Sequence, residues 1–155
     1  MSKVIVTIEI DEQNAEKMLE RIVKRSKDMR PVWRYAKRKL ESSFSQNFLS
    51  GGALVPGGWA PLDGSYSAWK AVHFPGAKKM FLTGKLFRSV SELSDTSVNK
   101  INRLSAEFGT NVEYAKFHQY GTSKMPARKI IFEPRGFTRD IAEKVKEHVV
   151  KEGRE

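Results

Sequence analysis

The chain has 155 residues, which suffices for one domain that buries roughly 70% of its unfolded surface. Its 28 Lys and Arg outnumber its 18 Asp and Glu, so the formal net charge is +10. Cysteine is absent, which excludes disulfides and thiolate chemistry, and no apolar run approaches the length of about 20 residues that a membrane span needs, so we expect a soluble protein.

The first two predicted elements are a strand and an amphipathic helix. In residues 4–10, Val and Ile on one face alternate with Thr and Glu on the other, which is the period of a strand. Asp11 is the predicted N-cap of the helix, which should end near Asp28. We expect this helix to pack one apolar stripe, formed by Ala15, Met18, Leu19, Ile22 and Val23.

A second helix is predicted to begin with Pro31 in its first turn, where the missing N–H of proline is no loss. Its apolar side comprises Val32, Tyr35, Ala36, Leu40, Phe44 and Phe48.

Residues 21–39, which span both predicted helices, are strongly basic. Such a stripe attracts DNA phosphates or an acidic protein surface, although a solvated helix face has the same composition. No zinc-finger spacing, RNP-like strand or clear helix-turn-helix accompanies it, so we expect no sequence-specific DNA recognition. The candidate basic patch is Arg21, Lys24, Arg25, Arg34, Lys37 and Arg38.

Residues 50–79 are rich in Gly and Pro and keep neither a helical nor a strand period. We therefore expect a long extended arm. The arm carries Trp59, Leu62 and Trp69, which a disordered linker would lack, so it should become ordered by packing. Its own core and a neighbouring subunit are both open as packing partners.

The second half of the chain contains a predicted hairpin. Residues 82–93 should pair in antiparallel with a strand at residues 103–109, across a polar turn at residues 94–100. Asn111 should then cap a helix over residues 112–120, which Gly121 ends.

A strand at residues 129–132 and a helix complete the predicted fold. Thr138 should cap this helix, with Asp140 in its first turn and an apolar stripe of Ile141, Val145 and Val149. Residues 153–155 should fray. The element order predicts an α+β fold: a single domain over residues 1–155 with a small, mostly antiparallel sheet packed with helices.

The sequence carries no catalytic or metal-binding pattern. His73, His118 and His148 are far apart and form no pair suited to zinc. Neither a P-loop nor a Gly-x-Gly-x-x-Gly motif occurs. We therefore expect no enzyme, no cofactor and no metal, and we interpret His118 as a structural histidine bonded to backbone.

Four short motifs occur in order between residues 59 and 132. They are Trp-Ala-Pro-Leu at residues 59–62, Leu-Thr-Gly-Lys-Leu at 82–86, Tyr-Ala-x-x-His-Gln-x-Gly at 114–121 and Pro-Ala-Arg at 126–128. This ordered set resembles the phage virion morphogenesis (tail completion) family. The family's usual acidic run near the end is not evident, and no motif matches before about residue 50.

The resemblance implies an interface or assembly role for eight residues. Gly84 would let the chain turn sharply, as would any turn glycine. Tyr114 and His118 share a helix face and can anchor it to the sheet or to a partner. Arg128 suits a bidentate carboxylate within or between subunits. The full set is Trp59, Leu62, Trp69, Gly84, Tyr114, His118, Gly121 and Arg128.

The resemblance also implies a non-enzymatic structural protein in the tail or neck region of a virion, made in the host cytoplasm. Such proteins form closed rings, commonly hexamers, and the implied partners are the tail tube protein and head–neck connector proteins, with DNA passing non-specifically through the lumen. A tail terminator and a head–neck connector are both compatible with the motifs. The alternative function, from the residues alone, is a non-specific nucleic-acid-binding module that uses residues 21–39.

Overall fold

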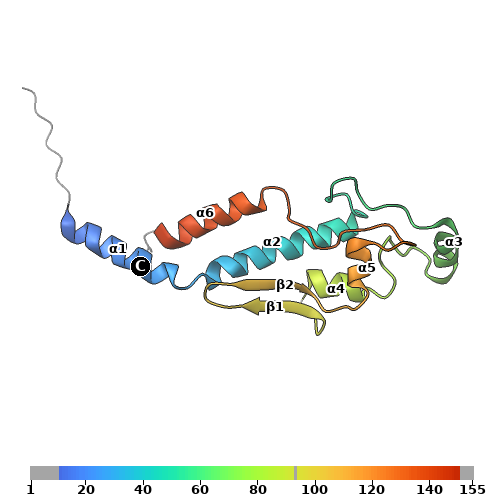
Figure 1. The fold of residues 1–155 in the computed structure, drawn as a ribbon, viewed down its shortest axis with the longest axis horizontal. Coiled ribbons are helices and arrows are strands. Elements are labelled where there is room, and N and C mark those ends of the chain that lie inside the picture. The colour runs from blue at the N-terminus through green and yellow to red at the C-terminus, as the bar shows by residue number, and fades with distance from the viewer. Residues whose placement is uncertain (1–10, 93, 151–155) are drawn as a thin grey trace, which may run out of the picture.

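The computed structural model describes residues 11–92 and 94–150, which form an elongated molecule around one long helix (Figure 1). Helices and a two-stranded antiparallel sheet confirm the predicted α+β class. The predicted strand at residues 4–10 and the fraying residues 153–155 lie outside the described residues. In chain order the elements are α1 (Glu12–Ser26), α2 (Arg30–Leu49), α3 (Gly64–His73), α4 (Lys85–Ser91), β1 (Ser97–Ile101), β2 (Ala106–Thr110), α5 (Ala115–Tyr120) and α6 (Phe137–Val150).

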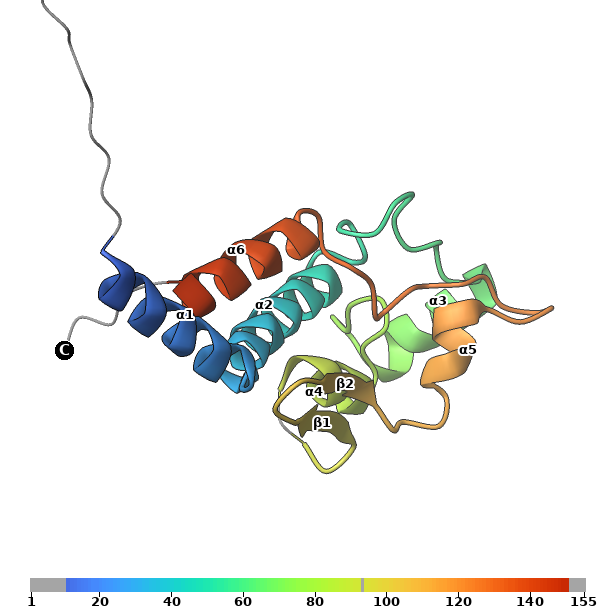
Figure 2. The same ribbon diagram turned by 60° about the vertical axis from the view of Figure 1, so that its left-hand side comes forward.

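Helix α2 is the central element, and it contacts α4, α6 and β1. Pro31 lies in its first turn, as predicted. The hairpin and α6 lie on opposite sides of α2 in both views (Figures 1 and 2). The predicted apolar side of α2 is confirmed, because it buries Val32, Ala36, Phe44 and Phe48.

The hydrophobic core lies beside the C-terminal half of α2. The ring of Phe48 packs edge-on against the rings of Trp59, Phe81 and Phe87, with centroids 5.1, 5.7 and 5.6 Å away. The buried members of this core are Phe44, Phe48, Val55, Trp59, Leu86, Val90, Val112, Ala115 and Ile130.

The junction between α1 and α2 is fixed by contacts to two distant parts of the chain. The backbone N–H of Met29 donates to the carbonyl of Arg103 at 2.7 Å, in the turn of the hairpin. A ring nitrogen of His148 on α6 lies 2.8 Å from the carbonyl of Asp28. Arg30 forms a hydrogen-bonded ion pair with Asp28, which lowers the pKa of that carboxyl to about 2.

Helix α1 begins where the sequence predicts and ends two residues earlier, and its apolar stripe packs only in part. The Asp11 carboxylate accepts from the N–H of Asn14 at 3.1 Å, so the predicted cap is confirmed. Ala15 and Ile22 are half-buried, whereas the side chains of Met18, Leu19 and Val23 are exposed. Among the described residues, the expectation of a packed stripe is therefore met only in part.

The prediction of a wholly irregular arm at residues 50–79 is wrong, because α3 interrupts it. The carboxylate of Asp63 accepts from the N–H groups of Ser65 and Tyr66, and this cap starts the helix despite Gly64. Trp59 packs on the chain's own core and is only 5% exposed, whereas Trp69 on α3 is 43% exposed. The part of the arm that holds Trp59 thus packs on the chain's own core, whereas packing of Trp69 on a neighbouring subunit stays a prediction.

The predicted pairing of residues 82–93 is also wrong. These residues contain α4, because Leu86, Ser89 and Val90 recur at helical spacing and are buried together. The partner of β2 is β1, within the stretch predicted as a turn. Strand β1 is polar enough to resemble a turn, but Val98 pairs with Gly109, and Lys100 forms a cross-strand ion pair with Glu107 at 3.3 Å.

Two helix starts and one strand in the last third of the chain differ from the predictions. Helix α5 begins at Ala115 rather than at residue 112, and the N–H of Asn111 donates to the carbonyl of Thr96, so Asn111 is not its cap. Residues 129–132 form no strand. Thr138 lies inside α6, where its hydroxyl donates to Glu133, whereas Asp140 does lie in the first turn.

Replacing Trp59 with Ala should cost about 3–5 kcal/mol of unfolding free energy, because the change deletes a core aromatic ring. It also removes the hydrogen bond from the indole N–H to the carbonyl of Lys129, which is 2.8 Å long. Trp69→Ala is the matched control, and we expect a change within about 0.5 kcal/mol in the monomer. Urea denaturation followed by circular dichroism measures both. Equal losses would contradict the different burial of the two rings.

Candidate functional site

The four motifs meet at one cavity of about 720 Å³ between α3, α4 and α5. Residues 62–70, 80–86, 114–118 and 124–128 contribute its lining, so segments far apart in sequence share one surface. We call it the α3–α5 cavity. Of the predicted assembly residues, Leu62, Gly84, Tyr114, His118 and Arg128 line it.

Arg128 fastens the first motif to the last. Its guanidinium donates from Nε to the carbonyl of Ala60 at 2.9 Å and from Nη2 to the carbonyl of Pro61 at 2.5 Å. Arg128 is 4% exposed, and its burial lowers the pKa of the guanidinium. The predicted carboxylate partner is wrong, since these two acceptors are main-chain carbonyls of the same chain.

The side-chain amide of Gln119 makes the hydrogen bonds to residues 130 and 131 that a paired strand at residues 129–132 would have made. Its side-chain oxygen accepts from the N–H groups of Ile130 and Ile131 at 2.9 and 3.0 Å. Its side-chain nitrogen donates to the carbonyl of Ile131 at 2.8 Å. One amide side chain thus satisfies three main-chain groups, a role that the sequence analysis missed although the residue belongs to the third motif.

Gly121 is required by the close approach of two backbones. It ends α5 with φ +74°, as predicted. A Cβ at this position would lie 2.8 Å from the nitrogen of Ala127 and 2.9 Å from the carbonyl oxygen of Met125, and neither atom can move independently of the main chain. The tight loop that follows is closed by a bridge between Thr122 and Met125.

Gly84 makes the sharp turn that the resemblance implies. It is the N-cap residue of α4 and has φ +74°, a left-handed conformation that favours glycine. This turn directs residues 82–83 toward the cavity and α4 into the core.

His118 and Tyr114 lie one helical turn apart on the cavity side of α5, with ring centroids 6.1 Å apart and the rings nearly perpendicular. The Nδ1 atom of His118 is buried and has no hydrogen-bond partner among the described residues, so the predicted backbone bond to its ring is not seen at this atom. Burial, and then the nearby Arg128 charge, lower the pKa of His118, so the ring is neutral at pH 7.

The charges that line the cavity are mostly positive. Lys70, Lys85, Lys124 and Arg128 line it against the single carboxylate of Asp63. Lys70 is buried and donates to the carbonyl of Lys78 at 2.6 Å, and burial lowers its pKa. Lys85 and Lys124 are exposed, so their charges are available to a partner.

Trp69 lies outside the cavity, on the exposed side of α3. Its ring stacks between those of Tyr66 and His73, with centroid distances of 5.7 and 4.7 Å. Phe117 and Tyr120 on α5 are also exposed. A side of α3 and a side of α5 are therefore both available for contact.

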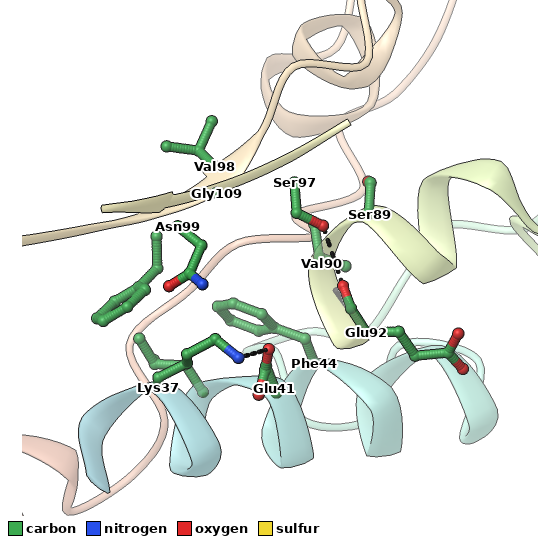
Figure 3. Close-up of a pocket in the computed structure, with 12 residues that line it drawn as sticks. Lys37, Glu41, Phe44, Ser89, Val90, Glu92, Ser97, Val98, Asn99 and Gly109 are labelled. Carbon is green, nitrogen blue, oxygen red and sulfur yellow. Dashed lines mark hydrogen bonds and ion pairs between the residues drawn. The ribbon is translucent and has the colours of Figure 1, made fainter. Parts of the chain in front are cut away.

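The predicted basic patch is partly neutralised. Lys37 pairs with Glu41 at 2.7 Å, at the mouth of a separate small cavity between α2, α4 and the hairpin (Figure 3). That cavity holds about 20 Å³, room for about one water molecule. Arg25 is half-buried. The exposed members of the patch are Arg21, Lys24, Arg34 and Arg38, on α1 and the first half of α2.

The described residues contain neither a metal-binding group nor a membrane-spanning helix. Across residues 11–92 and 94–150, no three or more His, Cys, Asp or Glu side chains gather into a group that could hold a metal ion. In the same part of the chain, no helix is both long and apolar enough to cross a membrane.

Comparison with known proteins gives a family and one relative. The model of the phage virion morphogenesis family matches residues 10–152. Mu-like prophage FluMu G protein 2 of Haemophilus influenzae is 28% identical over 133 residues, which cover 84% of this chain and 82% of the relative. No solved structure matches the chain. The family match extends well beyond residues 59–132, so it includes α1, α2 and α6.

Replacing Arg128 with Met should cost about 1–3 kcal/mol of unfolding free energy, since the carbonyls of Ala60 and Pro61 would lose their donors while the side chain keeps its length. Arg135→Met, at an exposed position, is the control and should change stability by less than about 0.5 kcal/mol. Urea denaturation of both variants measures the difference. An Arg128→Met protein as stable as the control would contradict a stabilising role for the hydrogen bonds from Arg128 to Ala60 and Pro61.

Lowering the pH should destabilise the fold through His118. Its folded-state pKa lies below the ordinary 6.5, so the unfolded chain binds a proton first, and the unfolding free energy falls as the pH drops below about 6.5. His118→Gln should reduce this fall, whereas the exposed His73→Gln should retain it. Urea midpoints at about pH 7.5 and 5.5 measure the effect. An unchanged pH dependence in His118→Gln would exclude this histidine as its source.

Proposed function

The chain belongs to the phage virion morphogenesis family, and from this premise we propose that it is a non-enzymatic structural protein that completes the tail of a phage. A role in virion assembly follows from the family itself. The more specific proposal is a homo-oligomeric ring at the upper end of the tail, where head and tail are joined. The observation that carries it is the family match over residues 10–152.

The surface of the molecule supports an assembly role. Large apolar side chains lie exposed on α1 at one end and on α3 and α5 at the other, and isolated exposed apolar residues are ordinary whereas grouped ones mark contact sites. Aromatic residues such as Trp69 and Tyr120 are typical anchors of protein interfaces. The hydrogen bonds of Arg128 to the carbonyls of Ala60 and Pro61 join two segments at the α3–α5 cavity within the single chain, which supports a preformed cavity.

The proposed partners are the proteins on either side of the joint between head and tail. The ring, proposed to be a hexamer, would contact the tail tube protein on one side and head–neck connector proteins on the other. DNA would pass through its lumen without sequence-specific contact, and the exposed Arg21, Lys24, Arg34 and Arg38 are available to its phosphates. In this proposal the protein acts in the virion and performs no chemistry.

Purified protein at micromolar concentration should give a multiple of its 17.7 kDa mass by native mass spectrometry and rings by electron microscopy. Tails assembled without the protein and then mixed with a tagged copy should carry the tag at one end. A chain that stays monomeric and leaves such tails unlabelled would overturn the proposal. Label along the whole tail would instead indicate a tube component.

A further inference from the structure

We propose that α1 of one copy docks on the α3–α5 cavity of the next copy. This inference rests on the proposed ring and deepens it by naming the contact that closes it. The two surfaces belong to the same chain but lie at opposite ends of its long axis, as both views show (Figures 1 and 2). A contact between unlike surfaces is heterologous, and repeated copies of it form a ring when the rotation closes.

Helix α1 presents an apolar surface that none of residues 11–92 and 94–150 covers. Leu19 is 62% exposed, and Met18 and Val23 are about half-exposed. Ala15 and Ile22, in the middle of the predicted stripe, are half-buried, and α1 contacts α6. Met18 is exposed on one side of them, and Leu19 and Val23 form a free flank on the other.

Acidic side chains share this free flank. Glu12 and Leu19 stand at positions i and i+7 of the helix, and so do Glu16 and Val23, so each pair lies on one face. No ion pair among the described residues involves Glu12 or Glu16. The surface of α1 is thus apolar with an acidic border in its first turns.

The α3–α5 cavity is complementary to α1 both in its apolar lining and in the sign of its charges. Its apolar lining includes Leu62, Tyr66 and Leu82, and its volume of about 720 Å³ admits several aliphatic side chains. Lys85 and Lys124 are exposed at its border. The acidic first turns of α1 therefore fit this cavity better than the basic last turns of α1 and the basic face of α2 do.

Charge reversal tests the pairing. The double variant Glu12→Lys/Glu16→Lys should weaken self-association about tenfold or more, because like charges would then face one another. Lys85→Glu/Lys124→Glu should do the same, and a mixture of the two double variants should recover association. Glu143→Lys, an exposed position on α6, is the control and should associate as the wild type does. Sedimentation velocity measures all four.

Disulfide trapping tests the geometry even where association is weak, since the chain has no cysteine of its own. Glu16→Cys protein mixed with Lys124→Cys protein should give a cross-linked heterodimer under mild oxidation, in clear excess over a mixture of Glu143→Cys with Lys124→Cys. Equal yields, or charge reversals that leave association unchanged, would overturn the contact. Rings seen under those conditions would leave the proposed function standing and assign the joint to other surfaces.

Discussion

The shape of the candidate site depends on one buried cation. Arg128 holds the carbonyls of Ala60 and Pro61, and next to it the indole of Trp59 donates to the carbonyl of Lys129. Two irregular segments nearly seventy positions apart are thus held together without a sheet between them. Irregular backbone near a core must satisfy its polar groups individually, and here side chains do so. Without these bonds the walls of the α3–α5 cavity would have no fixed relation to one another.

Local rules predicted the features that depend only on neighbouring residues. Asp11, Pro31 and Gly121 mark the start or end of a helix, as predicted, because capping, the fixed φ of proline and a positive φ act within a few residues of the chain. The predicted strand at residues 129–132 failed for the opposite reason. Its groups are satisfied by Gln119, a long-range side-chain contact that no periodicity encodes.

The motif set predicted where the site lies better than what each residue does. For Trp59 and Arg128 the sequence left contacts within the chain and between subunits open, and both are buried and bonded within the chain. A tryptophan or an arginine suits a core contact and an interface equally in chemical terms, so burial decides between them. Burial is a property of the folded chain, and it separated Trp59 from Trp69, which sit in the same Gly- and Pro-rich segment.

The separation of the buried core from the exposed helix α1 explains how one small chain can be stable and still offer apolar surface for contact. The buried residues that stabilise it, such as Phe48 and Ile130, belong to a core beside the C-terminal half of α2, whereas α1 contributes no buried residue. Substitutions at the exposed ends can therefore change association while the core keeps the fold, since surface changes cost little stability. A heterologous contact between the two different ends would form chains or rings rather than symmetric pairs. In such an assembly, the angle between successive copies would decide whether a chain of copies closes into a ring. That angle would be set by how α1 leaves the α1–α2 junction.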